Sequence, residues 1–128
     1  TACRFENGGL PAPGLYGLTE VIHTYMRLGA EDIQNYILEL SEYLYQRVKE
    51  VPGLSIAFEH DMEHRSSLTS ITYPEELKIT DADARRAGVR IRVQGKNKMR
   101  IGIHYYNNRN DIDRLMDYLK KRLEETRR

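Results

Sequence analysis

The sequence predicts an α+β domain with two N-terminal helices, a mostly antiparallel four-stranded sheet covered on one face by helices, and a C-terminal helix. Apolar residues recur at helical spacing over residues 15–51 and again after residue 108. Between these regions apolar and polar residues alternate, which is the period of a strand with one buried face. The 128 residues are 40% hydrophobic and 30% charged, with a net charge of +1. This composition is typical of a single globular domain.

Two helices are predicted in the first half of the chain. Residues 1–14 hold two of the four prolines, so we expect an extended segment there. Residues 15–28 carry an apolar stripe at helical spacing, and Gly29 follows where a helix would end. A stronger helix is predicted over residues 30–51, because its first turn is acidic and a Pro-Gly pair ends it.

Two strands and a short helix are predicted next. Residues 54–59 alternate between apolar and polar side chains, and residues 67–73 form a second strand of mixed pattern. Residues 81–87 indicate a short helix or turn, with Thr80 or Asp81 as its N-cap.

A β-hairpin is predicted within residues 88–108. Two alternating runs are joined by Gln-Gly-Lys-Asn-Lys, which predicts a five-residue loop. If the apolar positions share one face, Arg100 lies opposite Arg92 or Arg90. Like charges directly opposed across strands are destabilising, so arginines on one face indicate that an anion binds there. The alternative is a solvated basic face.

The last helix is predicted to begin after Asn108, its N-cap. Asp111, three residues later, gives an imperfect capping box. An apolar stripe follows, made of Ile112, Leu115, Met116, Leu119 and Leu123.

Composition and spacing also bear on function. No apolar run is long enough to span a membrane, and no secretory signal is evident. A single cysteine, Cys3, excludes an internal disulfide and favours a reducing compartment, so we expect a cytoplasmic protein. The chain starts at Thr1, which favours a fragment of a longer protein.

His60 and His64 have the spacing of two metal ligands, but no helical stripe surrounds them and no third ligand is evident. A solvated turn is therefore favoured, and no metal site is expected.

Both ends of the chain resemble one known family. Residues 99–108, Met-Arg-Ile-Gly-Ile-His-Tyr-Tyr-Asn-Asn, with Asp-Ile-Asp-Arg-Leu at 111–115, resemble the end of class V aminotransferases. These pyridoxal-phosphate (PLP) enzymes include cysteine desulfurases, selenocysteine lyase and isopenicillin N epimerase-like proteins. Residues 4–9, Arg-Phe-Glu-Asn-Gly-Gly, resemble the family's Arg-Phe-Glu-x-Gly-Thr segment. Residues 14–53 look like the helices that lead from its large domain to its small domain.

The resemblance implies the C-terminal small-domain part of such an enzyme. Residues 1–14 would be a cofactor-proximal segment, residues 15–53 the linking helices and residues 54–128 the small domain. In the family, the Arg of an Arg-x-Ser-x-x-x-Tyr-Asn run binds the substrate's α-carboxylate. This position is Arg100 here. Arg92 and His104 are further candidates for substrate contact, with a structural role as the favoured alternative for His104.

The resemblance also implies partners. Family members are dimers in which the segment matching Asn7, Gly8 and Gly9 approaches the PLP phosphate of the neighbouring subunit. The Schiff-base lysine lies on the large domain, so no catalytic residue is expected in this chain and PLP is expected only in the full-length enzyme. The implied partners are an amino-acid substrate, the large domain and a second subunit of a homodimer.

Three departures from the family pattern narrow the activity. Gly9 replaces a Thr, and Gly102 replaces the Ser after the carboxylate-binding Arg. The turn at residues 95–98 replaces the Cys-containing loop of the desulfurases. Because desulfurase chemistry needs a thiolate nucleophile, that activity is disfavoured, and the epimerase-like members are favoured.

Two other functions stay open. One is a non-catalytic domain for ligand sensing or oligomerisation. The other is a module for single-stranded nucleic acid, since residues 85–100 hold seven basic residues and no acidic one. No aromatic residue interrupts that stretch and the net charge is near zero, so nucleic acid is the weaker alternative. The sequence leaves the amino-acid substrate and the reaction subtype open.

Overall fold

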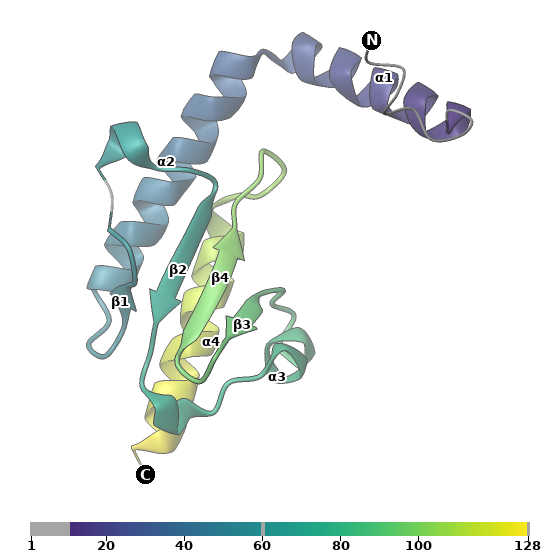
Figure 1. The fold of residues 1–128 in the computed structure, drawn as a ribbon. Coiled ribbons are helices and arrows are strands. Elements are labelled where there is room, and N and C mark those ends of the chain that lie inside the picture. Colours follow the sequence, from purple (N-terminus) through teal and green to yellow (C-terminus); the bar gives the residue numbers. More distant parts are fainter. Residues whose placement is uncertain (1–10, 60, 128) are drawn as a thin grey trace, which may run out of the picture. The chain divides into compact units, whose positions relative to one another are not determined.

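A computed structural model describes residues 11–59 and 61–127 (Figure 1). The chain divides into two compact units, Thr1–Ile33 and Gln34–Arg128, and each is described by itself. Within the described ranges, no helix is long and apolar enough to cross a membrane.

The first unit contains α1 (Ala12–Leu28), which begins three residues before the predicted start. Residues 1–14 were expected to hold no helix, because Pro13 falls inside them. The structure corrects this: Pro13 lies in the first turn of α1, where its missing N–H would have had no helical acceptor. The helix ends at Gly29, which has a φ of 86° and whose N–H donates to the Tyr25 carbonyl at 3.1 Å.

The next helix, α2 (Ala30–Lys49), contributes one side of the core of the second unit. Glu31 and Asp32 lie in its first turn, where negative charge is favourable. It ends two residues before the predicted boundary, at a turn around Gly53, which has a φ of 97°.

The sheet is antiparallel throughout, with strand order β1-β2-β4-β3. Its strands are β1 (Ser55–Ile56), β2 (Leu68–Thr72), β3 (Arg92–Gln94) and β4 (Lys98–Gly102). The first and third strands are shorter than the alternation predicted. Before β3 begins, the Val89 N–H donates to Ala84 O at 2.9 Å, so this residue is still bound to the end of α3.

The hairpin turn is also tighter than predicted. Gln94 already pairs with Lys98, so only residues 95–97 connect the strands instead of five. Gly95 adopts a φ of 66° in this turn, a value that suits glycine. Asn97 O accepts the Tyr73 N–H at 2.9 Å, which ties the turn to the end of β2.

Short helices connect the strands. The 3₁₀ turns η2 (Met62–His64) and η3 (Glu75–Leu77) flank β2, and α3 (Asp81–Arg86) precedes β3. Thr80 is the N-cap of α3, because its hydroxyl accepts the Asp83 N–H at 3.1 Å.

The last helix, α4 (Arg109–Thr126), begins with a complete capping box. Asn108 Oδ1 accepts the Asn110 and Asp111 N–H groups, and the Asp111 carboxylate accepts the Asn108 N–H at 3.1 Å. The sequence predicted an imperfect capping box, because Asp111 replaces the usual glutamate. In the structure both hydrogen bonds of the box are formed.

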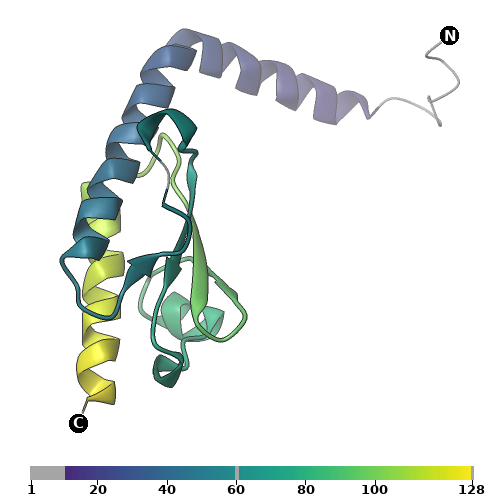
Figure 2. The same cartoon turned by 60° about the vertical axis from the view of Figure 1, so that its left-hand side comes forward.

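Helices α2 and α4 cover one face of the sheet (Figures 1 and 2). They are joined by Asp113 of α4, whose carboxylate accepts from Tyr43 at 2.7 Å and from Arg47 at 3.1 Å. The least exposed apolar side chains between helices and sheet are Leu44, Val48, Ile71, Met99, Met116 and Leu119. The predicted α+β architecture with a one-sided helical cover is confirmed. The opposite side, called here the open face, carries the candidate site.

Candidate functional site

The open face displays the arginines of the hairpin. Val93, Met99 and Ile101 point toward the core, whereas Arg92, next to Val93, and Arg100, between Met99 and Ile101, are exposed. The strand register places Arg92 directly opposite Arg100. This settles the two pairings left open by the sequence in favour of Arg92, and the two guanidinium groups share one face.

Backbone hydrogen bonds show how close these neighbours are. Just after β4, the Ile103 N–H donates to Ser67 O at 2.7 Å. The odd-numbered residues of β4 therefore direct their backbone N–H and C=O groups toward β2. Even-numbered Arg100 therefore directs its backbone groups toward β3, in a hydrogen-bonded pair with Arg92. In such pairs the Cα atoms are about 5.5 Å apart.

Ser70 lies on the other side of Arg100, in β2. Its carbonyl accepts the Ala57 N–H at 2.8 Å, so its backbone faces β1 and not β4. Ser70 and Arg100 are thus a non-hydrogen-bonded pair, the arrangement in which side chains approach most closely. The Ser70 and Arg100 side chains therefore leave the sheet from neighbouring positions on the same face.

One carboxylate reaches this face from α3. Asp81 Oδ1 accepts the Val93 N–H at 2.7 Å, and its Oδ2 accepts from Arg92 Nη1 at 3.3 Å. Among the described residues, no carboxylate pairs with Arg100 or with Arg90. The open face therefore carries positive charge that the described part of the protein does not balance.

His104 belongs to the turn that follows β4. Its N–H donates to Asn107 Oδ1 at 2.9 Å, and its carbonyl accepts the Asn107 N–H at 2.9 Å. The Tyr36 hydroxyl donates to Asn107 O at 2.8 Å, which fastens this turn to α2. The imidazole stacks on Tyr106, with centroids 4.3 Å apart and planes 19° apart, and lies 4.4 Å from the Tyr105 ring. His104 is exposed, just beyond the strand that carries Arg100.

Gly102 follows the candidate carboxylate-binding arginine by two residues. A Cβ at this position would meet only Leu68 Cδ2, at 3.5 Å, which is an ordinary contact. The backbone therefore has room for the serine of the family pattern, and the glycine is not required by packing.

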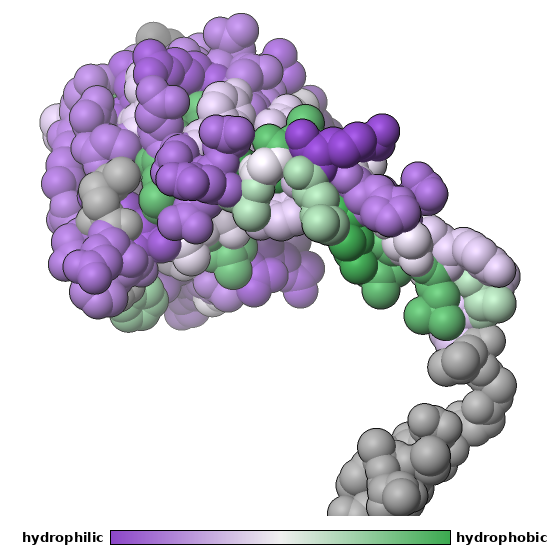
Figure 3. Space-filling model, turned by 90° about the horizontal axis from the view of Figure 1, so that it is seen from above, coloured by the Kyte–Doolittle hydropathy of each residue, from purple (hydrophilic) through white to green (hydrophobic). Residues whose placement is uncertain are grey.

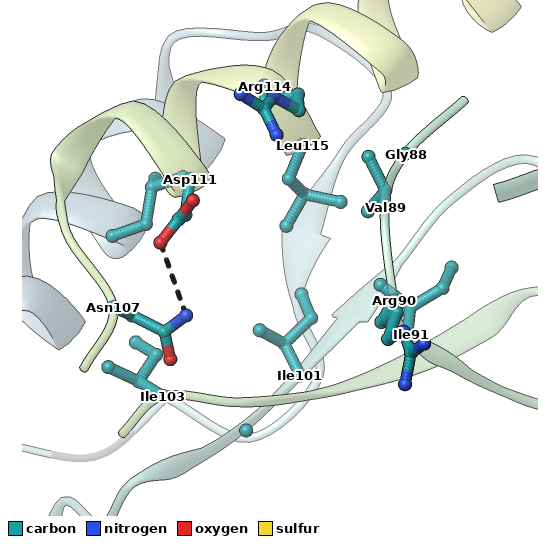
Figure 4. A pocket seen from close by; sticks show the side chains of 12 residues that line it. Gly88, Val89, Arg90, Ile91, Ile101, Ile103, Asn107, Asp111, Arg114 and Leu115 are labelled. Carbon is teal, nitrogen blue, oxygen red and sulfur yellow. Dashed lines mark hydrogen bonds between the residues drawn. The ribbon is translucent and has the colours of Figure 1, made fainter. Parts of the chain in front are cut away.

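A cavity of about 280 Å³ lies between α4, the end of β4 and the segment 88–91 (Figure 4). Its walls are mainly apolar, formed in part by Val89, Ile101 and Leu115, and an Asn107–Asp111 hydrogen bond of 3.3 Å crosses one side. Arg92, Arg100 and His104 do not line it. The cavity is therefore distinct from the open face.

Of the other predicted site residues, the structure describes only His64. Asn7, Gly8 and Gly9 lie outside the described residues, as does His60. His64 Nδ1 is 2.6 Å from Asp61 Oδ1. No group of three potential metal ligands occurs in the part of the chain that the structure describes.

Ser70 and Asp81 are site neighbours that the sequence did not single out. Ser70 lies in β2, where apolar and polar residues do not alternate regularly. The sequence therefore did not show which face of the sheet the Ser70 side chain is on. Asp81 was considered only as a helix cap, because nothing local in the sequence indicates that α3 packs beside β3.

Comparison with known proteins gives the family. The family model described as Aminotransferase class-V matches residues 1–115. No curated protein sequence matches the chain.

Solved structures share the fold. The cystine C–S lyase C-DES, solved with its product cysteine persulfide, superposes with a TM-score of 0.78 at 22% identity, covering 91% of this chain and 31% of its own. The cysteine desulfurase CsdA from Escherichia coli gives 0.76 at 17% identity, covering 93% of this chain and 32% of its own. A NifS-like protein from Rickettsia africae gives 0.55 at 18% identity, covering 73% of this chain and 29% of its own. The chain thus spans about a third of the length of these structures. Since the family model covers all but the last 13 residues, this chain belongs to the aminotransferase class V family.

Proposed function

We propose that this chain is the small domain of a PLP-dependent enzyme that acts on an amino acid, and that Arg100 binds the substrate's α-carboxylate. The observation that carries the proposal is the exposure of Arg100 on the open face, opposite a second arginine and without a described carboxylate partner. A strand tolerates this like-charge pair at a cost, which a bound anion offsets.

The local geometry suits a carboxylate. A guanidinium presents planar, paired N–H donors that match the two carboxylate oxygens. Arg100 projects from the central part of the sheet, whose opposite face is packed against the core through Met99 and Ile101. The fork is therefore held on a rigid element, and Ser70 could donate a further hydrogen bond to the same anion. His104 is proposed as an outer substrate contact, because its turn is fixed by the bonds of Asn107.

PLP, when bound, supplies an electron sink for bonds to the substrate's α-carbon. Two of the described lysines already have partners within this chain. Lys49 pairs with Glu59 and is 60% exposed, and Lys98 lies 5.6 Å from the Phe58 ring centroid. We therefore propose that a large domain supplies the Schiff-base lysine, and that Asn7, Gly8 and Gly9 contact the PLP phosphate of the neighbouring subunit.

The apolar side of α1 supports the proposal of further protein contacts. No residue of this helix is buried in the described structure, and Val21, Ile22 and Met26 are 63%, 47% and 71% exposed. Hydrophobic side chains follow the helix in Figure 3. Contiguous apolar surface of this kind is typical of an interface. We propose that the large domain covers it and that the complete enzyme is a homodimer.

The reaction subtype is proposed from the hairpin turn. The connection between β3 and β4 is only residues 95–97, and it contains no cysteine. A persulfide-forming nucleophile is therefore not available at this position. We propose lyase or epimerase chemistry over cysteine desulfurase chemistry.

The test of the proposal is Arg100→Lys in the complete enzyme. Lysine keeps the charge and loses the paired donors, so the KM for the amino acid should rise about tenfold or more, the loss of one charge-assisted hydrogen bond. Arg114→Lys is the matched control, because Arg114 is also exposed but lies on α4. An unchanged KM for Arg100→Lys would show that Arg100 does not hold the substrate.

A second test concerns the chain by itself. If the Schiff-base lysine lies elsewhere, the 128 residues mixed with PLP should show no stable visible absorbance and no covalent label after borohydride. A label on a lysine of this chain would contradict the proposal that the large domain supplies the Schiff-base lysine.

A further inference from the structure

We propose that the substrate carries a second acidic group, and that Arg92 binds it while Arg100 binds the first. The proposal rests on the function proposed for Arg100 and adds the substrate class: an amino acid with an acidic side chain. The observation behind it is the direct pairing of the two arginines in the strand register.

A single carboxylate would leave most of the N–H donors of Arg92 and Arg100 unused. Each guanidinium has five N–H donors, and a bidentate carboxylate occupies two of them. Arg92 gives a single hydrogen bond to Asp81, at 3.3 Å, and its side chain remains 70% exposed. Most of its donors therefore stay available on the same face as those of Arg100.

The spacing also suits a dianion. In a hydrogen-bonded antiparallel pair the two Cα atoms are about 5.5 Å apart, and the side chains leave the sheet side by side. The acid groups of a four- or five-carbon dicarboxylic acid are separated by a comparable distance. Such a ligand can therefore engage one guanidinium with each end.

Charge balance favours the same ligand. Lys98 lies two residues before Arg100 in β4, at the same strand parity, and has no carboxylate partner among the described residues. Asp81 is the one described carboxylate that pairs with the arginines of β3 and β4, and one of its oxygens is already used by the Val93 N–H. A monoanion would leave the face positive, whereas a dianion would neutralise it more fully.

The experiment is a titration of the 128-residue chain, followed by NMR of the arginine side-chain Nε–H groups. The probes are succinate and glutarate, with acetate as the monoanion. We expect acetate to shift the Arg100 signal, and the two dicarboxylates to shift both arginine signals with about tenfold higher affinity. Arg92→Gln should abolish this preference, so that succinate, glutarate and acetate bind the variant with similar affinities.

A matched variant separates a built site from general attraction. Lys96→Gln removes one exposed cation from the hairpin turn, away from the arginine pair, and should retain the preference for dicarboxylates. Equal losses in the Lys96 and Arg92 variants would overturn the inference. If Arg100 responds to acetate but no dicarboxylate preference appears, only this inference fails. If Arg100 responds to no carboxylate, the proposed function fails as well.

Discussion

Removing Arg100 should make the protein more stable while it weakens substrate binding. Arg100 faces Arg92 across the strands and has no ion pair among the described residues, so Arg100→Gln removes a repulsion and breaks no attraction. Two unit charges about 7 Å apart in a water-like dielectric repel by about 0.6 kcal/mol. This agrees with the range of about 0.2–1 kcal/mol for cross-strand pairs. The midpoint of thermal unfolding should rise by about 2 °C.

The assay is urea unfolding of four proteins that form a double-mutant cycle: the wild type, Arg92→Gln, Arg100→Gln and the double variant. The cycle isolates the coupling between the two arginines, which should be repulsive and of the size given above. In about 1 M salt the Debye length falls to about 3 Å, and the coupling should vanish. Arg114→Gln is the control and should change stability little, because that residue faces no second arginine. A coupling of zero at low salt, or a loss of stability in Arg100→Gln, would refute the reasoning.

Two further predictions concern the fold. Asn108→Ala should lower the free energy of unfolding by about 1 kcal/mol, because it removes the side chain that accepts two N–H groups at the start of α4; urea unfolding measures this, and an unchanged midpoint would contradict it. The hydrogen bond from Arg65 lowers the pKa of Glu42 below its ordinary value of 4.5. The ionised Glu42 therefore stabilises the fold above that value, and its contribution is lost as the pH falls through the lowered pKa. Glu42→Gln should cost about 0.5 kcal/mol near neutral pH, the size of a screened and partly exposed pair. The difference from the wild type should disappear in acid, and a difference that persists in acid would contradict this origin.

The hairpin shows how much of the site could be predicted from sequence. The period-two pattern gave the face on which the arginines lie, because a pleated strand alternates its side chains. It also limited the partner of Arg100 to two residues. The choice between them depends on the length of the turn, and the glycine at position 95 allowed a tighter turn than the polar residues around it suggested.

The neighbours of Arg100 could not be predicted in the same way. Ser70 reaches its position through the pairing of β2 with β4, and the two strands are separated in sequence by η3, α3 and β3. Asp81 reaches Arg92 because α3 packs beside the sheet edge. Both contacts depend on long-range packing, which local periodicity does not encode. Helix limits were predicted better, since caps and glycines are local signals.

The central claim is that Arg100 holds the carboxylate of an amino-acid substrate. Its most direct test is a crystal structure of the complete enzyme with that substrate bound. The account predicts the α-carboxylate within hydrogen-bond distance of the Arg100 guanidinium, on the open face of the sheet. A carboxylate held by another residue, with Arg100 left in solvent, would contradict it.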